Sequence, residues 1–165
     1  MSKLQRELAA VGRLPHDKND FVSAPYPLGA YPEVERSIVE QAAAVGFELP
    51  GVGARDLPVR ARHFELQTHS RSVEEHTDDV GRGRVWFGLL PVRSRQVVGG
   101  PYSTDTWLHF RLGRQRLRRR MQVGSLIVFN PLAPHSLVYY GEETTFALLA
   151  LVRARRGLAR AARLG

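Results

Sequence analysis

The sequence predicts a mainly β fold of the sandwich or jelly-roll type, preceded by helices that pack on one sheet. Apolar residues at helical spacing mark residues 1–12 and 33–46, whereas short alternating patterns separated by glycine-containing turns begin near residue 59. The expected strands span residues 60–69, 73–78, 84–92, 106–112, 116–122, 125–130, 135–140 and 144–153. A series of about eight short strands with turn signals between them is typical of a jelly roll.

Two amphipathic helices are expected ahead of these strands, over residues 1–12 and 33–46. The second begins after Pro32, has acidic residues in its first turn and ends at Gly46. The apolar residues at helical spacing are Leu4, Leu8 and Val11 in the first helix, and Val34, Ile38, Ala42 and Val45 in the second. We expect the second set to face a sheet. The prolines of 13–32 predict an extended or looping segment.

The length of 165 residues suits one domain with one core. Within it we expect helical and loop support over 1–58, a β core over 59–153 and a basic tail over 154–165. The sequence has no apolar run long enough to cross a bilayer, and its first residues are too polar for a signal peptide. We therefore expect a cytoplasmic protein that does not enter a membrane.

The absence of cysteine limits the chemistry that is available to the chain. It excludes disulfides, zinc knuckles, Fe–S clusters and thiol nucleophiles. Any metal site must be built from histidines and carboxylates, and this ligand set suits Fe(II) and similar metals better than soft ones.

The formal charge of +8 comes almost entirely from arginine, since Lys3 and Lys18 are the only lysines. This ratio is typical of a GC-rich genome, so nucleic acid is the less favoured partner. The most basic stretch carries Arg111, Arg114, Arg116, Arg118, Arg119 and Arg120. We interpret it as a solvated hairpin face, with binding to a phosphate backbone as the alternative. The oligomeric state stays open.

The pattern His76-Thr77-Asp78 is the sharpest chemical feature of the sequence. Residues i and i+2 of a strand point to the same side, so His76 and Asp78 are expected to enter one cavity together. His135, which opens a later strand, is the best third ligand. Two histidines and one carboxylate form a facial triad, which leaves three coordination positions of a metal open.

With these residues in place, the chain resembles the Fe(II)/2-oxoglutarate-dependent oxygenase superfamily over about residues 60–153. The resemblance depends on His76-Thr77-Asp78, on the stretch GSLIVFNPLAPHSLVYYG and on the closing strand TFALLALVR. It implies a double-stranded β-helix, which is a cupin-like jelly roll. It also implies an oxidoreductase, a dioxygenase that hydroxylates or oxidatively demethylates its substrate.

The resemblance also implies the cofactors and the site. Fe(II) would be held by His76, Asp78 and His135, with 2-oxoglutarate as cosubstrate and with no catalytic residue beyond the metal ligands. The substrate is expected to be a small molecule or a protein side chain.

The chain departs from the superfamily at the residue that grips the distal carboxylate of 2-oxoglutarate. Many members have an arginine about ten residues after the last histidine, where this chain has Glu142-Glu143-Thr144-Thr145. A basic residue from another strand is the expected substitute, because arginine binds carboxylates in a bidentate manner. Arg111, which alternates onto the same strand face as Trp107 and His109, is the first choice, followed by Arg153 and Arg84.

Aromatic and polar residues are the candidates for contact with the substrate. Tyr102 and Trp107 are expected to stack on it. One of Tyr139 and Tyr140, just past His135, is expected to point inward. In the strand at 60–69 a polar set alternates with apolar residues and faces either the site or water; its members are His63, Glu65, Gln67 and His69.

Two other functions stay open from the sequence. The first is a cupin-like metal enzyme that does not use 2-oxoglutarate, which a fourth protein ligand such as His69 or His63 would favour. The second is a non-catalytic basic jelly-roll module that binds nucleic acid.

Overall fold

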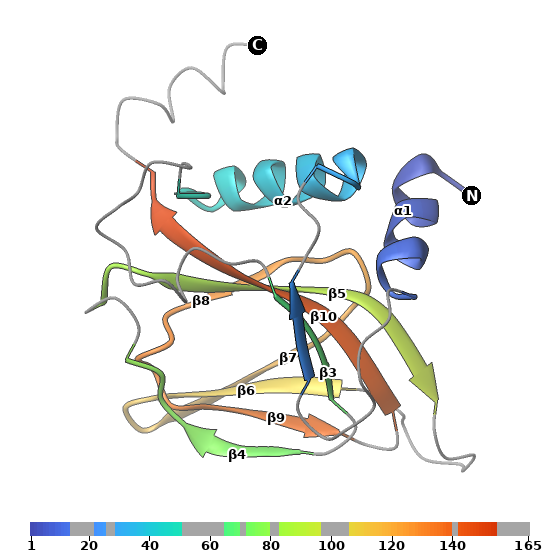
Figure 1. Cartoon of the computed structure of the whole chain (residues 1–165). Helices are drawn as coiled ribbons and strands as arrows, with labels where there is room; N and C mark the ends of the chain where they lie inside the picture. The colour runs from blue at the N-terminus through green and yellow to red at the C-terminus, as the bar shows by residue number, and fades with distance from the viewer. Residues whose placement is uncertain are drawn as a thin grey trace.

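The computed structural model describes residues 1–13, 22–25, 29–50, 65–69, 72–79, 83–96, 106–139 and 142–154. Two antiparallel sheets are stacked face to face, and two helices cover the outer face of the larger sheet (Figure 1). The mainly β fold with N-terminal helices on one sheet is confirmed. In the described part of the chain, no helix is both long and apolar enough to span a membrane.

The two helices are α1 (Lys3–Val11) and α2 (Pro32–Ala44). Ser2 caps α1 in a capping box with Gln5. The carboxylate of Glu7, in α1, accepts hydrogen bonds from the backbone N–H groups of Glu33 (2.7 Å) and Val34 (3.2 Å) at the start of α2. One helix therefore supplies the cap that the other lacks, since Tyr31 makes no side-chain cap.

The larger sheet has six strands and the smaller has four. The larger sheet has the order β1 (Val22–Pro25), β3 (Glu65–His69), β10 (Glu142–Arg153), β5 (Trp86–Gln96) and β8 (Ile127–Phe129), with β2 (Phe47–Glu48) also pairing with β10. The smaller sheet has the order β4 (Val73–His76), β9 (His135–Tyr139), β6 (Thr106–Leu112) and β7 (Gln115–Arg120). Successive strands mostly alternate between the sheets, as in a double-stranded β-helix.

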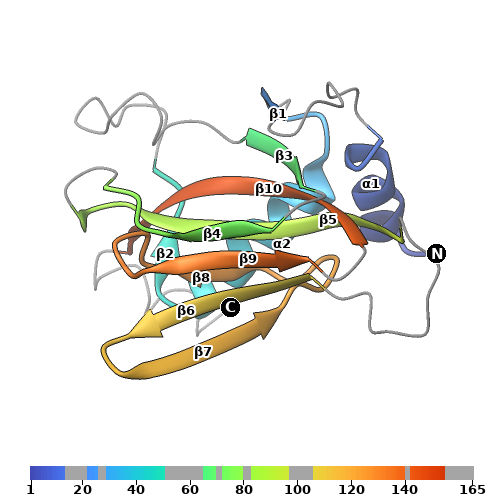
Figure 2. The same ribbon diagram turned by 90° about the horizontal axis from the view of Figure 1, so that it is seen from below.

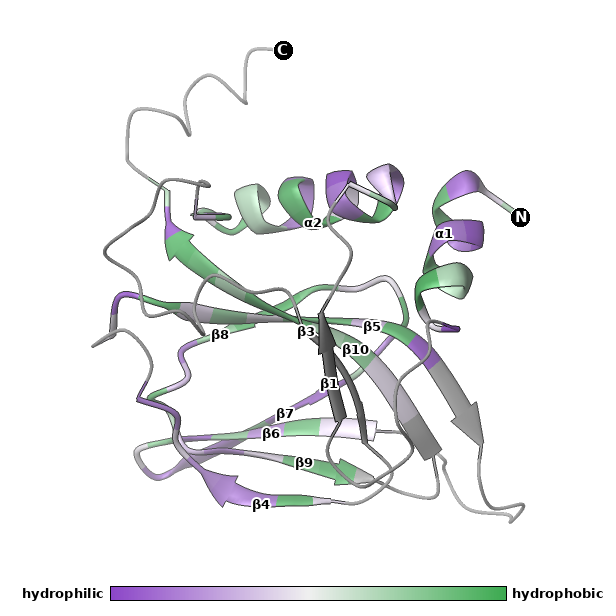
Figure 3. Cartoon of the chain, in the orientation of Figure 1, coloured by the Kyte–Doolittle hydropathy of each residue, from purple (hydrophilic) through white to green (hydrophobic). Residues whose placement is uncertain are grey.

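The larger sheet is buried on both faces. Toward the helices it packs Leu90, Val92, Ala147 and Leu149 against Leu8, Val11, Val34 and Ile38. Toward the smaller sheet, Leu89, Phe129 and Phe146 meet Leu108, Met121 and Leu137. The apolar colour along β5, β8 and β10 in Figure 3 follows from this double burial, since each apolar side chain removed from water stabilises the fold.

The eight predicted strands correspond to β3–β10. The bounds of β6 are as predicted and most other ends differ by a few residues, while residues 60–64 and 140 lie outside the described residues. Two strands were not predicted: β1 lies in the proline-containing segment, and the two-residue β2 is too short to show alternation. The placement of Val45 on the buried face of α2 is wrong. Because the helix ends at Ala44 and Gly46 has a positive φ of 85°, the chain turns there and Val45 is 59% exposed.

Replacing Ile38 with alanine is expected to lower the free energy of unfolding by about 3 kcal/mol, because Ile38 is fully buried between α2 and the larger sheet. The neighbouring Val39 is half exposed, so Val39→Ala is expected to change that free energy by less than about 0.5 kcal/mol. Urea unfolding of the two variants measures both values. Equal losses would contradict this packing of α2.

Candidate metal centre

The pairing of β4 with β9 sets two histidines side by side. His76 and His135 are direct partners in the antiparallel register, so their side chains leave the sheet on the same face. Their ring centroids are 4.4 Å apart, with the ring planes inclined by 53°. Residues that are 59 positions apart in the chain thus become nearest neighbours through the strand register alone.

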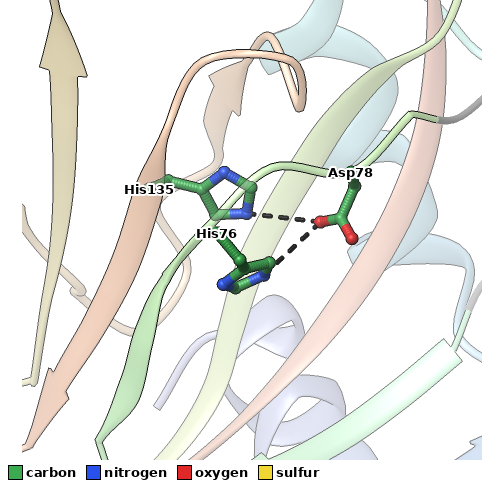
Figure 4. Close-up of side chains that lie close together, drawn as sticks. All are labelled: His76, Asp78 and His135. Carbon is green, nitrogen blue, oxygen red and sulfur yellow. Dashed lines mark ion pairs between the residues drawn. The ribbon is translucent and has the colours of Figure 1, made fainter.

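Asp78 also lies beside the two histidines, but a loop positions it rather than the strand that was predicted. The strand was expected to continue to residue 78, but β4 ends at His76. The backbone N–H of Asp78 instead donates a hydrogen bond of 2.9 Å to the carbonyl oxygen of Pro131, in the loop that leads to His135. The Asp78 Oδ2 atom then lies 3.3 Å from His135 Nε2 and 3.6 Å from His76 Nε2 (Figure 4).

The other ring nitrogen of each histidine is held by a carbonyl two residues earlier. The Nδ1–H of His76 donates to Glu74 O at 2.7 Å, and the Nδ1–H of His135 donates to Ala133 O at 2.8 Å. A carbonyl oxygen only accepts, so the proton of each neutral imidazole is on Nδ1 and the lone pair is on Nε2. Both lone pairs are therefore directed toward the Asp78 carboxylate.

Two lone pairs and a carboxylate that converge in this way need a cation between them, either a metal ion or a proton on one Nε2. Burial lowers the pKa of the His135 imidazole, and repulsion from His76 acts in the same direction, against the raising effects of the Ala133 carbonyl and of Asp78. Protonation of His135 is disfavoured as a result.

One side of the site is buried against an aromatic ring, and the other side is exposed to solvent. The side chain of His135 is only 6% exposed, and the ring of Phe129 packs against it with a centroid distance of 4.9 Å. The side chains of His76 and Asp78 are 42% and 37% exposed. A bound ion would thus have an apolar wall behind it and accessible coordination positions in front.

The three side chains fit a metal ion. One ligand atom from each residue lies within 4.8 Å of the others. Bonds of about 2.1 Å at right angles place neighbouring ligand atoms about 3 Å apart, and the distances of 3.3 and 3.6 Å from Asp78 to the two imidazoles are close to that value. Two imidazoles and one carboxylate on one face of the ion match the ligand set of non-haem Fe(II) oxygenases.

The first-choice anchor for the cosubstrate, Arg111, lies on the other face of the smaller sheet. Phe110 is the register partner of His135, so the side chain of Arg111 leaves the sheet on the side away from the triad. There its Nη2 atom forms an ion pair of 2.8 Å with Glu75. The structure does not bring Arg111 to the metal centre.

The second choices lie in two different places. The Arg153 guanidinium stacks on Trp86 (5.0 Å) and Phe47 (5.7 Å), with the residues that face α2. Arg84 is exposed in the turn before β5. A Cβ atom on the neighbouring Gly83 would lie 3.4 Å from the side chain of Leu132, so this turn borders the loop that precedes His135.

Of the candidate substrate contacts, the structure describes the side chain of Trp107, which does not face the triad. Trp107 alternates with Phe110 and lies on the outer face, with the Arg118 guanidinium 5.0 Å from its ring centroid. Tyr102, Tyr140 and His63 are outside the described residues. So are the side chains of Tyr139 and of the other polar candidates, Glu65, Gln67 and His69.

The residues that the sequence analysis missed are aromatic. Phe110 and Phe129 (5.3 Å between centroids) form an apolar surface that reaches His135, and Phe87 meets Phe129 edge-on at 5.8 Å. The signal was present, since Phe110 belongs to the apolar face of its strand. The polar face of the strand carries the candidate ligands, but in this sandwich that face is turned away from the core.

Comparison with known proteins bears on the fold. No protein-family model and no curated protein matches the chain. A prolyl-4-hydroxylase from Pseudomonas putida matches in structure with a TM-score of 0.53 at 16% identity, over 94% of this chain and 89% of the other. A 2OG-Fe(II) oxygenase family oxidoreductase from Burkholderia pseudomallei matches with a TM-score of 0.56 at 13% identity, over 93% and 80%. The chain shares its fold with 2OG-Fe(II) oxygenases.

A third solved structure has the same fold. HygX from Streptomyces hygroscopicus, with nickel and 2-oxoglutarate bound, matches with a TM-score of 0.55 at 10% identity, over 92% of this chain and 78% of the other. The chain also spans 66% of a cysteine peptidase from Thevetia peruviana latex and 40% of a DMSP lyase chain, at TM-scores of 0.41 and 0.37 that are too low to bear on function.

The metal centre is expected to bind one divalent ion, and His135→Ala is expected to weaken that binding by roughly a hundredfold or more, because it removes a buried ligand. Isothermal titration with Ni(II), or anaerobically with Fe(II), measures the affinity. His109→Ala is the matched control, since His109 lies on the outer face of the smaller sheet. A similar loss in both variants would show that the ion binds elsewhere.

Proposed function

We propose that this protein is an Fe(II)- and 2-oxoglutarate-dependent oxygenase that hydroxylates, or oxidatively demethylates, a small molecule or a protein side chain. One observation carries the proposal: both imidazole lone pairs and the Asp78 carboxylate are directed at one point inside a double-stranded β-helix. HygX, which has the same fold, was solved with nickel and 2-oxoglutarate bound, and this similarity supports the proposal.

The chain would contribute an open metal site. His76, Asp78 and His135 would hold Fe(II) through Nε2, a carboxylate oxygen and Nε2. When bound, Fe(II) and 2-oxoglutarate supply the reaction with O2 that oxidises a substrate C–H bond and yields succinate and CO2. The carbonyl groups of Glu74 and Ala133 keep each imidazole in the tautomer and orientation that binding needs.

The aromatic wall would keep water away from the reacting centre. Phe129 packs on the buried His135 ring and Phe110 packs on Phe129, so the ion would have no water behind it. Exclusion of water strengthens the electrostatic interactions of the site and limits side reactions. The exposed edges of His76 and Asp78 leave the opposite side for the cosubstrate and the substrate.

For the distal carboxylate of 2-oxoglutarate we propose Arg84 rather than Arg111 or Arg153. Arg111 is paired with Glu75 on the outer face, and Arg153 stacks on Trp86 and Phe47. The turn that carries Arg84 borders the loop before His135. A guanidinium at this edge of the site would pair with a carboxylate in a bidentate manner.

With Fe(II), ascorbate and O2, the protein is expected to convert 2-oxoglutarate slowly to succinate even without its substrate. His76→Ala is expected to reduce this rate roughly a hundredfold or more, because the metal loses a ligand. His109→Ala, on the outer face, is the control and is expected to keep the rate. Succinate is measured by chromatography. Tight Fe(II) binding without succinate formation would contradict the use of 2-oxoglutarate.

A cupin-like metal enzyme that uses no 2-oxoglutarate is the second candidate. Arg111 pairs with Glu75 and Arg153 stacks on aromatic rings, so neither arginine is directed at the triad. This arrangement favours the second candidate. Anaerobic addition of 2-oxoglutarate to the Fe(II) protein separates the candidates. A visible charge-transfer band of the chelate supports the oxygenase, and its absence with Fe(II) bound supports the second candidate.

A further inference from the structure

The β6–β7 hairpin carries a row of cations on the face of the smaller sheet that is turned away from the metal centre. Trp107, His109 and Arg111 of β6 lie opposite Arg120, Arg118 and Arg116 of β7 in the register. They share the outer face because Phe110, between His109 and Arg111, is the partner of His135 on the inner face. We call these six residues the arginine face.

The arginines of this face are exposed to solvent, whereas Trp107 and His109 are half-buried. Every residue of β7 is exposed, and β7 is the end strand of the four-stranded sheet. Both helices lie beyond the larger sheet, on the opposite side of the molecule (Figure 1), and the hairpin extends from the body of the protein in Figure 2. The hydrophilic colour of β7 in Figure 3 contrasts with the strands beneath the helices.

The charges of the arginine face work against the fold. Arg116 lies directly opposite Arg111. Like charges in directly opposed positions destabilise a sheet. Charged residues on an edge strand such as β7 protect it from aggregation. That protection does not explain Arg111, because β6 is not an edge strand. Arg111 also pairs with Glu75. A polyanionic ligand would lower the repulsion between Arg111 and Arg116.

The spacing and the aromatic residue indicate which polyanion fits. Arg116, Arg118 and Arg120 alternate along one strand, so their Cα atoms follow each other at about 6.6 Å. That step suits successive phosphates of an extended single strand. Trp107 lies beside them, with the Arg118 guanidinium 5.0 Å from its ring centroid. Cations along a backbone together with a stacking ring are the elements that bind single-stranded nucleic acid.

We propose that the arginine face binds single-stranded nucleic acid, with the arginines of β7 contacting phosphates and Trp107 stacking on a base. Arg118 would move from the Trp107 ring to a phosphate as the base takes its place. This site is separate from the metal centre and its occupancy does not depend on the metal. An acidic protein segment fits less well, because it would leave the aromatic ring without a stacking partner.

The test is fluorescence anisotropy of the full-length protein with a labelled oligothymidine and a mixed-sequence RNA, over a range of salt concentrations. The variant R116Q/R118Q/R120Q is expected to bind more than tenfold more weakly than the parent. Its plot of log affinity against log salt is expected to be shallower by about 2, because three phosphate contacts are lost. R6Q/R13Q/R36Q removes the same charge from the helical side and is expected to change the affinity less than twofold.

Trp107→Leu separates stacking from charge and retains apolar bulk. It is expected to weaken binding roughly tenfold while the salt slope stays unchanged. All variants are expected to keep their Ni(II) affinity, which shows that they fold and that the result is independent of the proposed oxygenase activity.

Three results would overturn the proposal: an equal loss of affinity in both triple variants, tighter binding of a duplex of the same length, or displacement of the oligonucleotide by polyglutamate at matched charge. The first would mean that net charge alone attracts nucleic acid. The second would assign a different nucleic acid to the hairpin. The third would mean that the face recognises any polyanion.

Discussion

The pairing of β4 with β9 is the constraint on which the rest of the structure depends. It places His76 opposite His135, and a shift of one residue would turn one imidazole to the other face of the sheet. Val73 of β4 and its partner Leu137 of β9 pack in the core between the sheets, and the pairing shifts register between Val73 and His76. Burial of the apolar pair joins the strands, and the irregularity that follows it sets His76 opposite His135.

The two faces of the smaller sheet differ in chemistry because one meets the core between the sheets and the other is turned away from it. The inner face is apolar around a small polar centre, and there the carbonyl groups of Glu74 and Ala133 decide which nitrogen of each imidazole is available. The outer face carries the arginines of the β6–β7 hairpin, of which Arg111 pairs with Glu75. One strand, β6, contributes Phe110 to the first face and Arg111 to the second, through alternation alone.

Much of this arrangement could be predicted from the sequence. The strands of the core, the helices ahead of them and the three residues of the triad follow from periodicity, turn residues and the His-x-Asp pattern. The arginines could not be placed, because alternation says which residues share a face but not which face meets the core. Trp107 and Arg111 were assigned to the site for their chemistry, although the apolar partners of Phe110 put them outside. The hydrogen bond from Asp78 to Pro131 joins two loops and leaves no periodic signal.

The central claim is that His76, Asp78 and His135 bind one ion through both Nε2 atoms and a carboxylate oxygen. A crystal structure grown anaerobically with Fe(II) and 2-oxoglutarate tests it most directly. The account predicts one ion with these three ligands on one face and the two Nδ1 atoms still bonded to Glu74 and Ala133. Ligation through Nδ1, an ion at another place, or a fourth protein ligand in the position of the cosubstrate would contradict it.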